Sequence, residues 1–207
     1  MADFADALGA VEREVVRDEK TVLVRLRRGY DAAVEDVWSA LTDPARLSRW
    51  FMPVGGDLRE GGTFSVQGEP MGRILECAPP DLLRFTYGAE TSVVEVRLES
   101  AAGGTDVLLE HSVPLEFAQS GAGSLNVGPG WDIAYLGLGL HLAGEEVGDP
   151  MAWEGSLPVQ RYAAGTVDAW TGAAKGTATE DEIAGAAAAA RAHFAPDLEG
   201  GGQAGSA

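Results

Sequence analysis

The chain has 207 residues, 45% of them hydrophobic and 23% charged, which is an ordinary composition for a globular protein with a substantial core. It carries 32 Asp and Glu residues against 15 Lys and Arg, giving a formal net charge of −17. A field of this sign repels phosphate backbones and anionic lipid surfaces, so we expect neither nucleic acid nor a membrane surface as a partner.

The sequence holds a single cysteine, Cys77, which can form neither an internal disulfide nor a cysteine-based metal site. Its place before Pro79-Pro80 is typical of a small buried hydrophobic residue at a strand end. No apolar run reaches the roughly 18 residues of a membrane span, so we expect no membrane insertion. The N-terminus shows no basic stretch followed by an apolar core, and we therefore expect a cytoplasmic protein.

The first 20 residues are predicted to form an N-terminal helical segment, because apolar side chains recur at helical spacing from Phe4 to Val15. Residues 21–30 alternate between apolar and polar side chains, as a half-buried strand does. Two short amphipathic helices are predicted next, joined at Thr42-Asp43-Pro44. Proline suits the first turn of a helix, and Thr42 or Asp43 can accept hydrogen bonds from its free amides.

Residues 55–113 predict an antiparallel meander of four or five strands with one apolar face. Short alternating runs are separated by turn signals such as Gly61-Gly62, Pro79-Pro80-Asp81 and Ala102-Gly103-Gly104. The segment from Gly121 to Ser124, which follows the meander, is interpreted as a mobile lip.

A long helix is predicted from Trp131 to about Val147, with one apolar stripe along it. Gly137, Gly139 and Gly144 are unusual inside a helix, so either the sheet approaches closely there or space is left for something else. Residues 149–195 are predicted to form a helical appendage packed on the main domain, and residues 196–207 a disordered tail.

This order of elements is that of the helix-grip fold, an α+β fold in which a curved antiparallel sheet wraps around a long C-terminal helix. The chain resembles the SRPBCC superfamily of START and birch-pollen-allergen relatives, in the branch similar to the C-terminal domain of the heat-shock-protein-90 ATPase activator. The resemblance covers about residues 21–148. It is carried by an ordered set of short pieces: Val37 to Pro44, Trp50-Phe51, Asp57-Leu58-Arg59, Gly61-Gly62, Gly72, Pro79-Pro80, Gly104-Thr105, Glu110-His111 and Gly130-Trp131.

The resemblance implies a cavity between the sheet and the long helix, open in many relatives to lipids or other apolar small molecules. Together with the strand alternation it gives a set of candidate lining residues, although core packing is the more common role for each one taken alone. These candidate ligand-binding residues are Trp50, Phe51, Phe64, Met71, Phe85, Tyr87, His111, Trp131, Tyr135 and Leu138.

His111 is the first candidate general acid or base if the protein is an enzyme, with Tyr87 or Tyr135 as a phenolic donor. The alternation of its strand points His111 inward. A lone inward histidine is more often hydrogen-bonded in the core than catalytic. The three histidines are too dispersed for a metal site, and we expect no metal and no cofactor. The glycine pairs lack a phosphate-loop context, and no Gly-x-Ser-x-Gly pattern occurs.

The first functional hypothesis is a non-enzymatic carrier or sensor that binds an apolar lipid-like or polyketide-like small molecule. The second is an aromatase/cyclase-like enzyme that folds and dehydrates a polyketide-type chain in the same cavity. The third is a protein-interaction module similar to the chaperone activator. A chaperone partner is left open, although the sequence offers no counterpart of that activator's N-terminal domain, which argues against a true co-chaperone role. A homodimer is left open.

Overall fold

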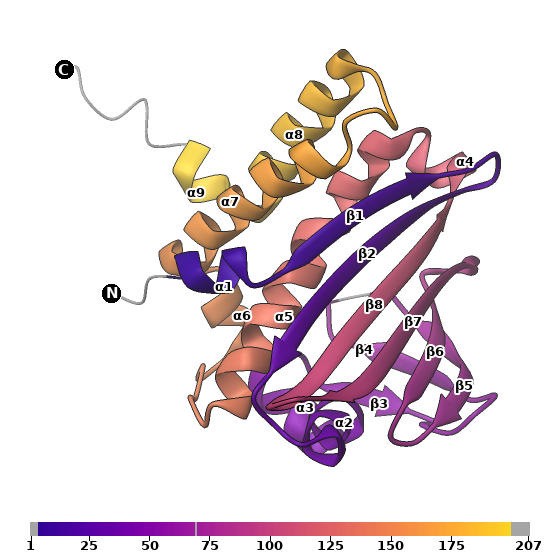
Figure 1. Cartoon of the computed structure of the whole chain (residues 1–207), viewed down its shortest axis with the longest axis vertical. Helices are drawn as coiled ribbons and strands as arrows, with labels where there is room; N and C mark the ends of the chain where they lie inside the picture. The colour runs from indigo at the N-terminus through magenta and orange to yellow at the C-terminus, as the bar shows by residue number, and fades with distance from the viewer. Residues whose placement is uncertain (1–3, 69, 200–207) are drawn as a thin grey trace.

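The computed structural model describes residues 4–68 and 70–199, in which a curved sheet wraps around a long helix (Figure 1). The strands lie in the order β1-β2-β8-β7-β6-β5-β4-β3, and neighbouring strands are antiparallel throughout. This arrangement confirms the predicted α+β helix-grip fold. The strands are β1 (Glu12–Arg17), β2 (Thr21–Tyr30), β3 (Val54–Gly56), β4 (Thr63–Val66), β5 (Gly72–Ala78), β6 (Leu82–Tyr87), β7 (Ala89–Ala101) and β8 (Gly104–Pro114).

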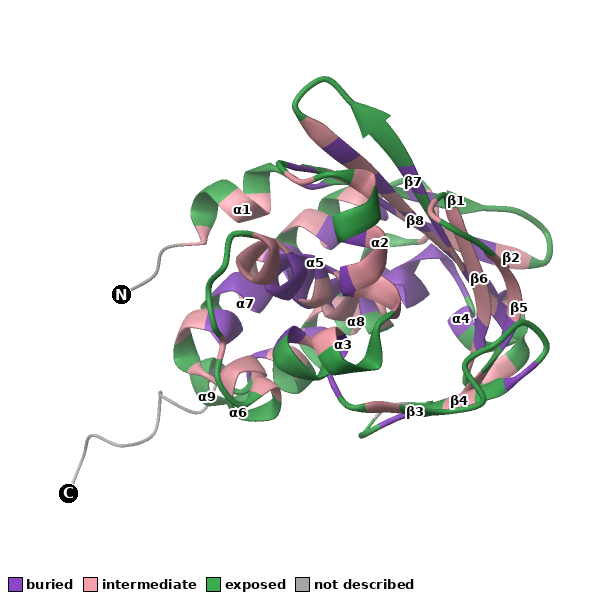
Figure 2. Cartoon of the chain, turned by 90° about the horizontal axis from the view of Figure 1, so that it is seen from below, coloured by how far each residue is buried: buried purple, intermediate pink, exposed green. Residues whose placement is uncertain are grey.

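The helices cover the concave face of the sheet, with α5 lying between the sheet and α7 (Figure 2). Helices α2 and α3 sit at one end of the long strands (Figure 1). The helices are α1 (Ala5–Gly9), α2 (Val34–Thr42), α3 (Pro44–Trp50), α4 (Leu115–Ala118), the 3₁₀ helix η1 (Gly121–Asn126), α5 (Gly128–Leu142), α6 (Pro150–Glu154), α7 (Leu157–Ala173), α8 (Glu180–Phe194) and α9 (Pro196–Glu199).

The alternation of the long strands divides apolar from charged side chains. Val22, Val24 and Leu26 of β2 are completely buried on the concave face. On the convex face Arg25 pairs with Glu110 of the neighbouring strand β8. A one-residue shift in register would move each set to the other face, so this pattern fixes the strand pairing.

The break between α2 and α3 follows from the predicted capping chemistry. The Oδ1 atom of Asp43 accepts a hydrogen bond from the amide of Ala45 at 2.8 Å, and Pro44 occupies the first turn of α3. Thr42 instead donates its hydroxyl to the carbonyl of Trp38 at 2.8 Å. The short α3 then ends at Trp50, beside the concave face.

The helix α5 begins at Gly128 and ends at Leu142, five residues before the predicted end at Val147. Its end is set by Gly144, whose positive φ of 78° allows the amide of Glu145 to bond the carbonyl of Leu140.

The glycines inside α5 allow close approach by other elements. A Cβ atom at Gly137 would lie 2.8 Å from the main-chain oxygen of Trp50, and one at Gly139 would lie 3.0 Å from Nη2 of Arg28. The predicted approach of the sheet is therefore found only at Gly139, through a side chain of β2. At Gly137 the close neighbour is the end of α3, and Gly144 lies beyond the end of the helix with no atom near its Cβ position.

The prediction of one helical segment over residues 1–20 is wrong for its second half. Only α1 is helical, and residues 12–17 form the edge strand β1, in which Val15 pairs with Val24 of β2. Val11 and Val15 are four apart, which fits a helix, but pairing with an available sheet edge decides the conformation. Residues 1–3 lie outside the described part of the chain.

The predicted mobile lip is instead the buried 3₁₀ helix η1, where Gly121 to Leu125 are all buried. A Cβ atom at Gly121 would lie 1.8 Å from Oγ1 of Thr177, so the glycine permits this close packing.

The predicted disordered tail begins too early. Residues 196–199 form α9, which Asp197 ties to Gln160 through hydrogen bonds of 2.9 and 2.7 Å. The rest of the predicted tail, residues 200–207, lies outside the described part of the chain.

The C-terminal helices join the remainder of the protein through a buried ionic network. The carboxylate of Asp132 on α5 is completely buried and accepts hydrogen bonds from Arg13 of β1 at 2.6 and 3.0 Å. It also accepts one from the indole of Trp170 on α7 at 2.7 Å. Burial raises the pKa of Asp132, and the hydrogen bonds from Arg13 and Trp170 oppose that rise. The domain boundaries at residues 20 and 148 stay predictions.

Candidate ligand-binding cavity

Two apolar pockets lie between the concave face of the sheet and the helices α2, α3 and α5. Their volumes are about 110 and 160 Å³. They share part of their lining, and we call them together the inner cavity. The residues that line both pockets are Leu41, Thr42, Leu47, Phe51, Leu83, Phe85 and Trp131.

The elements described above account for these positions. Leu83 and Phe85 are two apart on β6 and therefore share its concave face. Trp131 lies in the first turns of α5, and Phe51 follows the last residue of α3. A strand, a helix and a helix end thus each supply part of one apolar wall.

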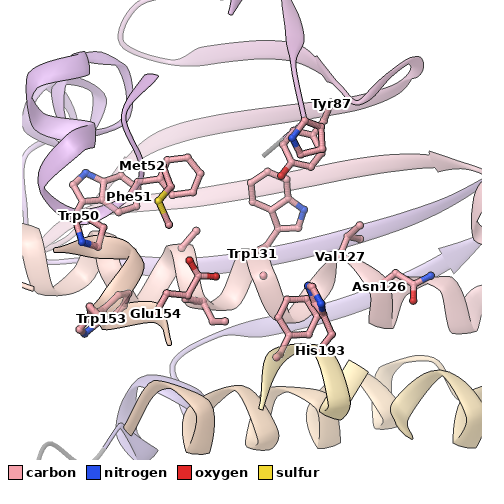
Figure 3. Close-up of a pocket in the computed structure, with 16 residues that line it drawn as sticks. Trp50, Phe51, Met52, Tyr87, Asn126, Val127, Trp131, Trp153, Glu154 and His193 are labelled. Carbon is pink, nitrogen blue, oxygen red and sulfur yellow. The ribbon is translucent and has the colours of Figure 1, made fainter. Parts of the chain in front are cut away.

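A third and larger pocket, of about 300 Å³, lies on the other side of this wall, and we call it the outer groove (Figure 3). It is bordered by α5, α6, the end of α8 and the segment after α3. Its lining includes the polar side chains of Asn126, Glu154 and His193.

Aromatic side chains separate the two spaces. Phe51 and Trp131 line the outer groove and both pockets of the inner cavity, and Tyr87 lines the groove and the larger inner pocket. The ring centroids of Tyr87 and Trp131 are 5.4 Å apart, and those of Trp50 and Phe51 are 5.6 Å apart. These side chains therefore form the wall between the groove and the cavity.

His111 holds one of these aromatic residues in place. Its Nδ1 atom accepts a hydrogen bond from the indole Nε1 of Trp131 at 3.1 Å, and its Nε2 lies 2.8 Å from Oγ of Ser92. An indole N–H only donates, so Nδ1 carries no proton and Nε2–H donates to Ser92. Burial lowers the pKa of His111 to about 4, so the ring is neutral at pH 7.

Most of the predicted lining residues do border these spaces. Trp50, Phe51, Phe64, Phe85, Tyr87, Trp131, Tyr135 and Leu138 line the inner cavity, the outer groove or both. That any of them contacts a ligand stays a prediction.

Met71 does not line the cavity and is 71% exposed. It precedes the first residue of β5, and its carbonyl accepts a hydrogen bond from the amide of Gly88 while its side chain points to solvent. His111 is likewise absent from the lining of the three pockets; it is buried in the core, where both its ring nitrogens make hydrogen bonds.

Tyr135 contributes its ring to the cavity but not its hydroxyl group. The hydroxyl lies 3.3 Å from the carbonyl oxygen of Leu26 and 3.2 Å from that of Val107. Burial raises the pKa of Tyr135 well above its ordinary value. This phenol is bound to the backbone of the sheet, and so it is not placed to act as the predicted donor.

Several lining residues were not predicted. Cys77 lines the larger inner pocket, and Leu41 and Leu47 line both. Trp153 and Glu154 of α6 line the outer groove. The helical spacing of Leu41 and Leu47 was a usable signal, whereas nothing in the sequence shows where α6 packs.

A curved sheet, a long helix and an apolar cavity between them define a helix-grip protein. Residues 31–142 match the family described as "Activator of Hsp90 ATPase homolog 1-like protein", and the chain belongs to this family. The comparison with curated proteins gave no match.

Solved structures extend the comparison. The crystal structure of CalU16 from Micromonospora echinospora has 36% sequence identity and a TM-score of 0.67, covering 80% of this chain and 99% of that one. The solution structure of CalU16 has 31% identity and a TM-score of 0.59, covering 93% and 94%. DynU16, described as a protein in the dynemicin biosynthetic locus, shares the fold at 24% identity and a TM-score of 0.52, covering 59% and 48%.

Two further observations concern residues 4–68 and 70–199 only. None of the helices found there has the length and apolar character needed to cross a membrane. No three His, Cys, Asp or Glu side chains in these ranges come together in a group that could hold a metal ion.

Proposed function

We propose that the protein is a non-enzymatic carrier or sensor that binds an apolar small molecule in the inner cavity. The observation that carries this proposal is the pair of apolar pockets between the sheet and α5, which share much of their lining. An engineered cavity of about 150 Å³ is large enough to take up benzene. The larger inner pocket, at about 160 Å³, therefore accommodates one ring or a short alkyl chain.

The character of the lining supports a binding role. The larger inner pocket is bordered mainly by apolar and aromatic side chains, among them Leu41, Leu47, Phe64 and Phe85. Concave spaces lined in this way are typical of sites that bind small molecules.

The state of His111 favours binding over catalysis. A general base needs a lone pair that reaches the substrate, but the Nδ1 lone pair of His111 accepts the indole proton of Trp131. The hydroxyl of Tyr135 is likewise held by the sheet backbone. The proposal therefore assigns no reaction to the cavity, and His111 acts in it by positioning Trp131.

The outer groove gives the bound molecule a second compartment and a way in. A polyketide-like or lipid-like ligand exceeds either inner pocket, so it would place one apolar end in the inner cavity and the remainder in the groove. The aromatic wall of Phe51, Tyr87 and Trp131 would then contact the ligand along its middle.

Binding of 1-aminoanthracene, an uncharged fluorescent three-ring probe, tests the proposal. Ala134 lines both the groove and the inner cavity, so Ala134→Phe should fill the connecting space and weaken probe binding at least about tenfold. Ala188 is exposed on α8, and Ala188→Phe adds the same ring outside the site. Equal probe binding by wild type and both variants would refute the proposed location, and no binding by wild type would refute the function.

A further inference from the structure

We propose that the outer groove binds the ammonium group of an amphipathic ligand whose apolar part occupies the inner cavity. This inference rests on the proposed function and adds the chemical class of the ligand. It comes from the carboxylate, the aromatic faces and the charge balance of the groove lining.

The carboxylate is that of Glu154, the last residue of α6, and it points into the groove (Figure 3). Its helix is fixed at both ends. The Oδ1 atom of Asp149 caps the first turn by accepting from the amide of Ala152 at 2.8 Å. The side chain of Gln160 donates to the carbonyl of Gly155 at 2.8 Å. Glu154 is therefore presented from a defined position.

Aromatic side chains line the same groove as this carboxylate. The groove lining includes Trp50, Phe51, Tyr87, Trp131, Trp153 and Phe194. The faces of such rings carry negative potential and attract cations, most strongly for tryptophan. Gly137 contributes indirectly, since a Cβ atom there would meet both Trp50 and Trp153, at 3.3 Å and 3.5 Å from their rings.

The charge balance of the groove favours a cation over an anion. Among its lining residues in the described part of the chain there is no Lys or Arg, and His193 is the one basic side chain. The formal net charge of −17 adds an attractive field for cations. An anionic head group would be repelled both by the carboxylate of Glu154 and by this field.

The groove and the cavity are close enough for one ligand. Phe51 and Trp131 line both spaces, so a head group beside Glu154 and an alkyl chain beyond Trp131 would be only one aromatic side chain apart. Helices α6 and α8 lie outside residues 31–142, the part that matches the family. Preference for ammonium compounds would therefore be a property of chains that carry these helices.

Titration calorimetry with three eight-carbon compounds, kept below micelle-forming concentrations, tests the inference. The compounds are octyltrimethylammonium, octyl sulfate and 1-octanol. We expect wild type to bind octyltrimethylammonium about tenfold more tightly than octyl sulfate. Glu154→Gln should weaken octyltrimethylammonium binding about fivefold and change octanol binding less than about twofold.

Glu146→Gln is the matched control, because it removes the same charge from an exposed position outside the groove. It should leave octyltrimethylammonium binding within about twofold of wild type. Octanol binding together with equal affinities of wild type and Glu154→Gln for octyltrimethylammonium would overturn the ammonium site while the proposed function stood. Failure of all three compounds to bind wild type would overturn both.

Discussion

The hydrogen bonds of His111 predict a specific dependence of stability on pH. In the folded protein Nδ1 accepts the indole proton of Trp131, so a proton on Nδ1 would oppose this donor. Burial lowers the pKa of His111 to about 4, below the 6.5 of an unperturbed histidine. Between these values the unfolded chain binds a proton that the folded protein does not.

The contribution of His111 is therefore fully present above pH 6.5 and is lost as the pH falls toward 4. By linkage, the difference between the pKa of His111 in the unfolded chain and in the folded protein corresponds to about 3 kcal/mol of unfolding free energy. About 2 kcal/mol of this is lost by pH 5. Carboxylates titrate in the same range, so the wild-type curve alone does not isolate the histidine. Comparison with His111→Gln, which cannot titrate at this position, removes their common contribution.

Urea unfolding of wild type and His111→Gln at pH 7, 6 and 5 is the assay. The difference in unfolding free energy between the two proteins should shrink by about 2 kcal/mol from pH 7 to pH 5. Long-range proton–nitrogen NMR should show His111 with a proton on Nε2 only. A stability difference that stays constant over this range, or a protonated Nδ1, would refute the reasoning.

Three other outcomes follow from the packing. Asp132→Asn should destabilise the protein by about 3–5 kcal/mol in urea unfolding, because it leaves the buried guanidinium of Arg13 without its ionic partner; a loss below about 1 kcal/mol would contradict the buried network. Gly137→Ala should cost about 1–3 kcal/mol, since its Cβ would lie 2.8 Å from a main-chain oxygen, whereas Gly130→Ala, whose Cβ would be at ordinary contact distance, should be neutral or stabilising; equal effects would contradict the close approach. Binding of 1-aminoanthracene should slow the reaction of Cys77 with an apolar thiol reagent at least about threefold, because Cys77 lines the larger inner pocket; an unchanged rate would place the probe elsewhere.

The fold was predictable because several local signals agree. Alternation over residues 21–30 and 92–113 gives the long strands, and Asp43-Pro44 gives the helix break. The edge strand β1 was not predictable from spacing alone. Side chains four residues apart, such as Val11 and Val15, share one face of a helix and also share one face of a strand. The conformation of this segment depends on pairing with β2, which is a tertiary interaction.

A lining residue was predictable only where its position depends on a single strand or helix. Phe85 and Trp131 follow from strand alternation and helix position. Met71 was misplaced because alternation does not show where a strand begins, and Met71 precedes β5 by one residue. Trp153 and Glu154 enter the groove because α6 packs against α3 and α7, an arrangement set by long-range packing rather than by local pattern.

Native mass spectrometry of the protein purified from its own host tests the central claim most directly. We expect one small apolar molecule per chain, released on denaturation, and its loss in Ala134→Phe but not in Ala188→Phe. A wild-type protein that carries no molecule and also fails to bind 1-aminoanthracene would contradict the claim that the inner cavity is a binding site.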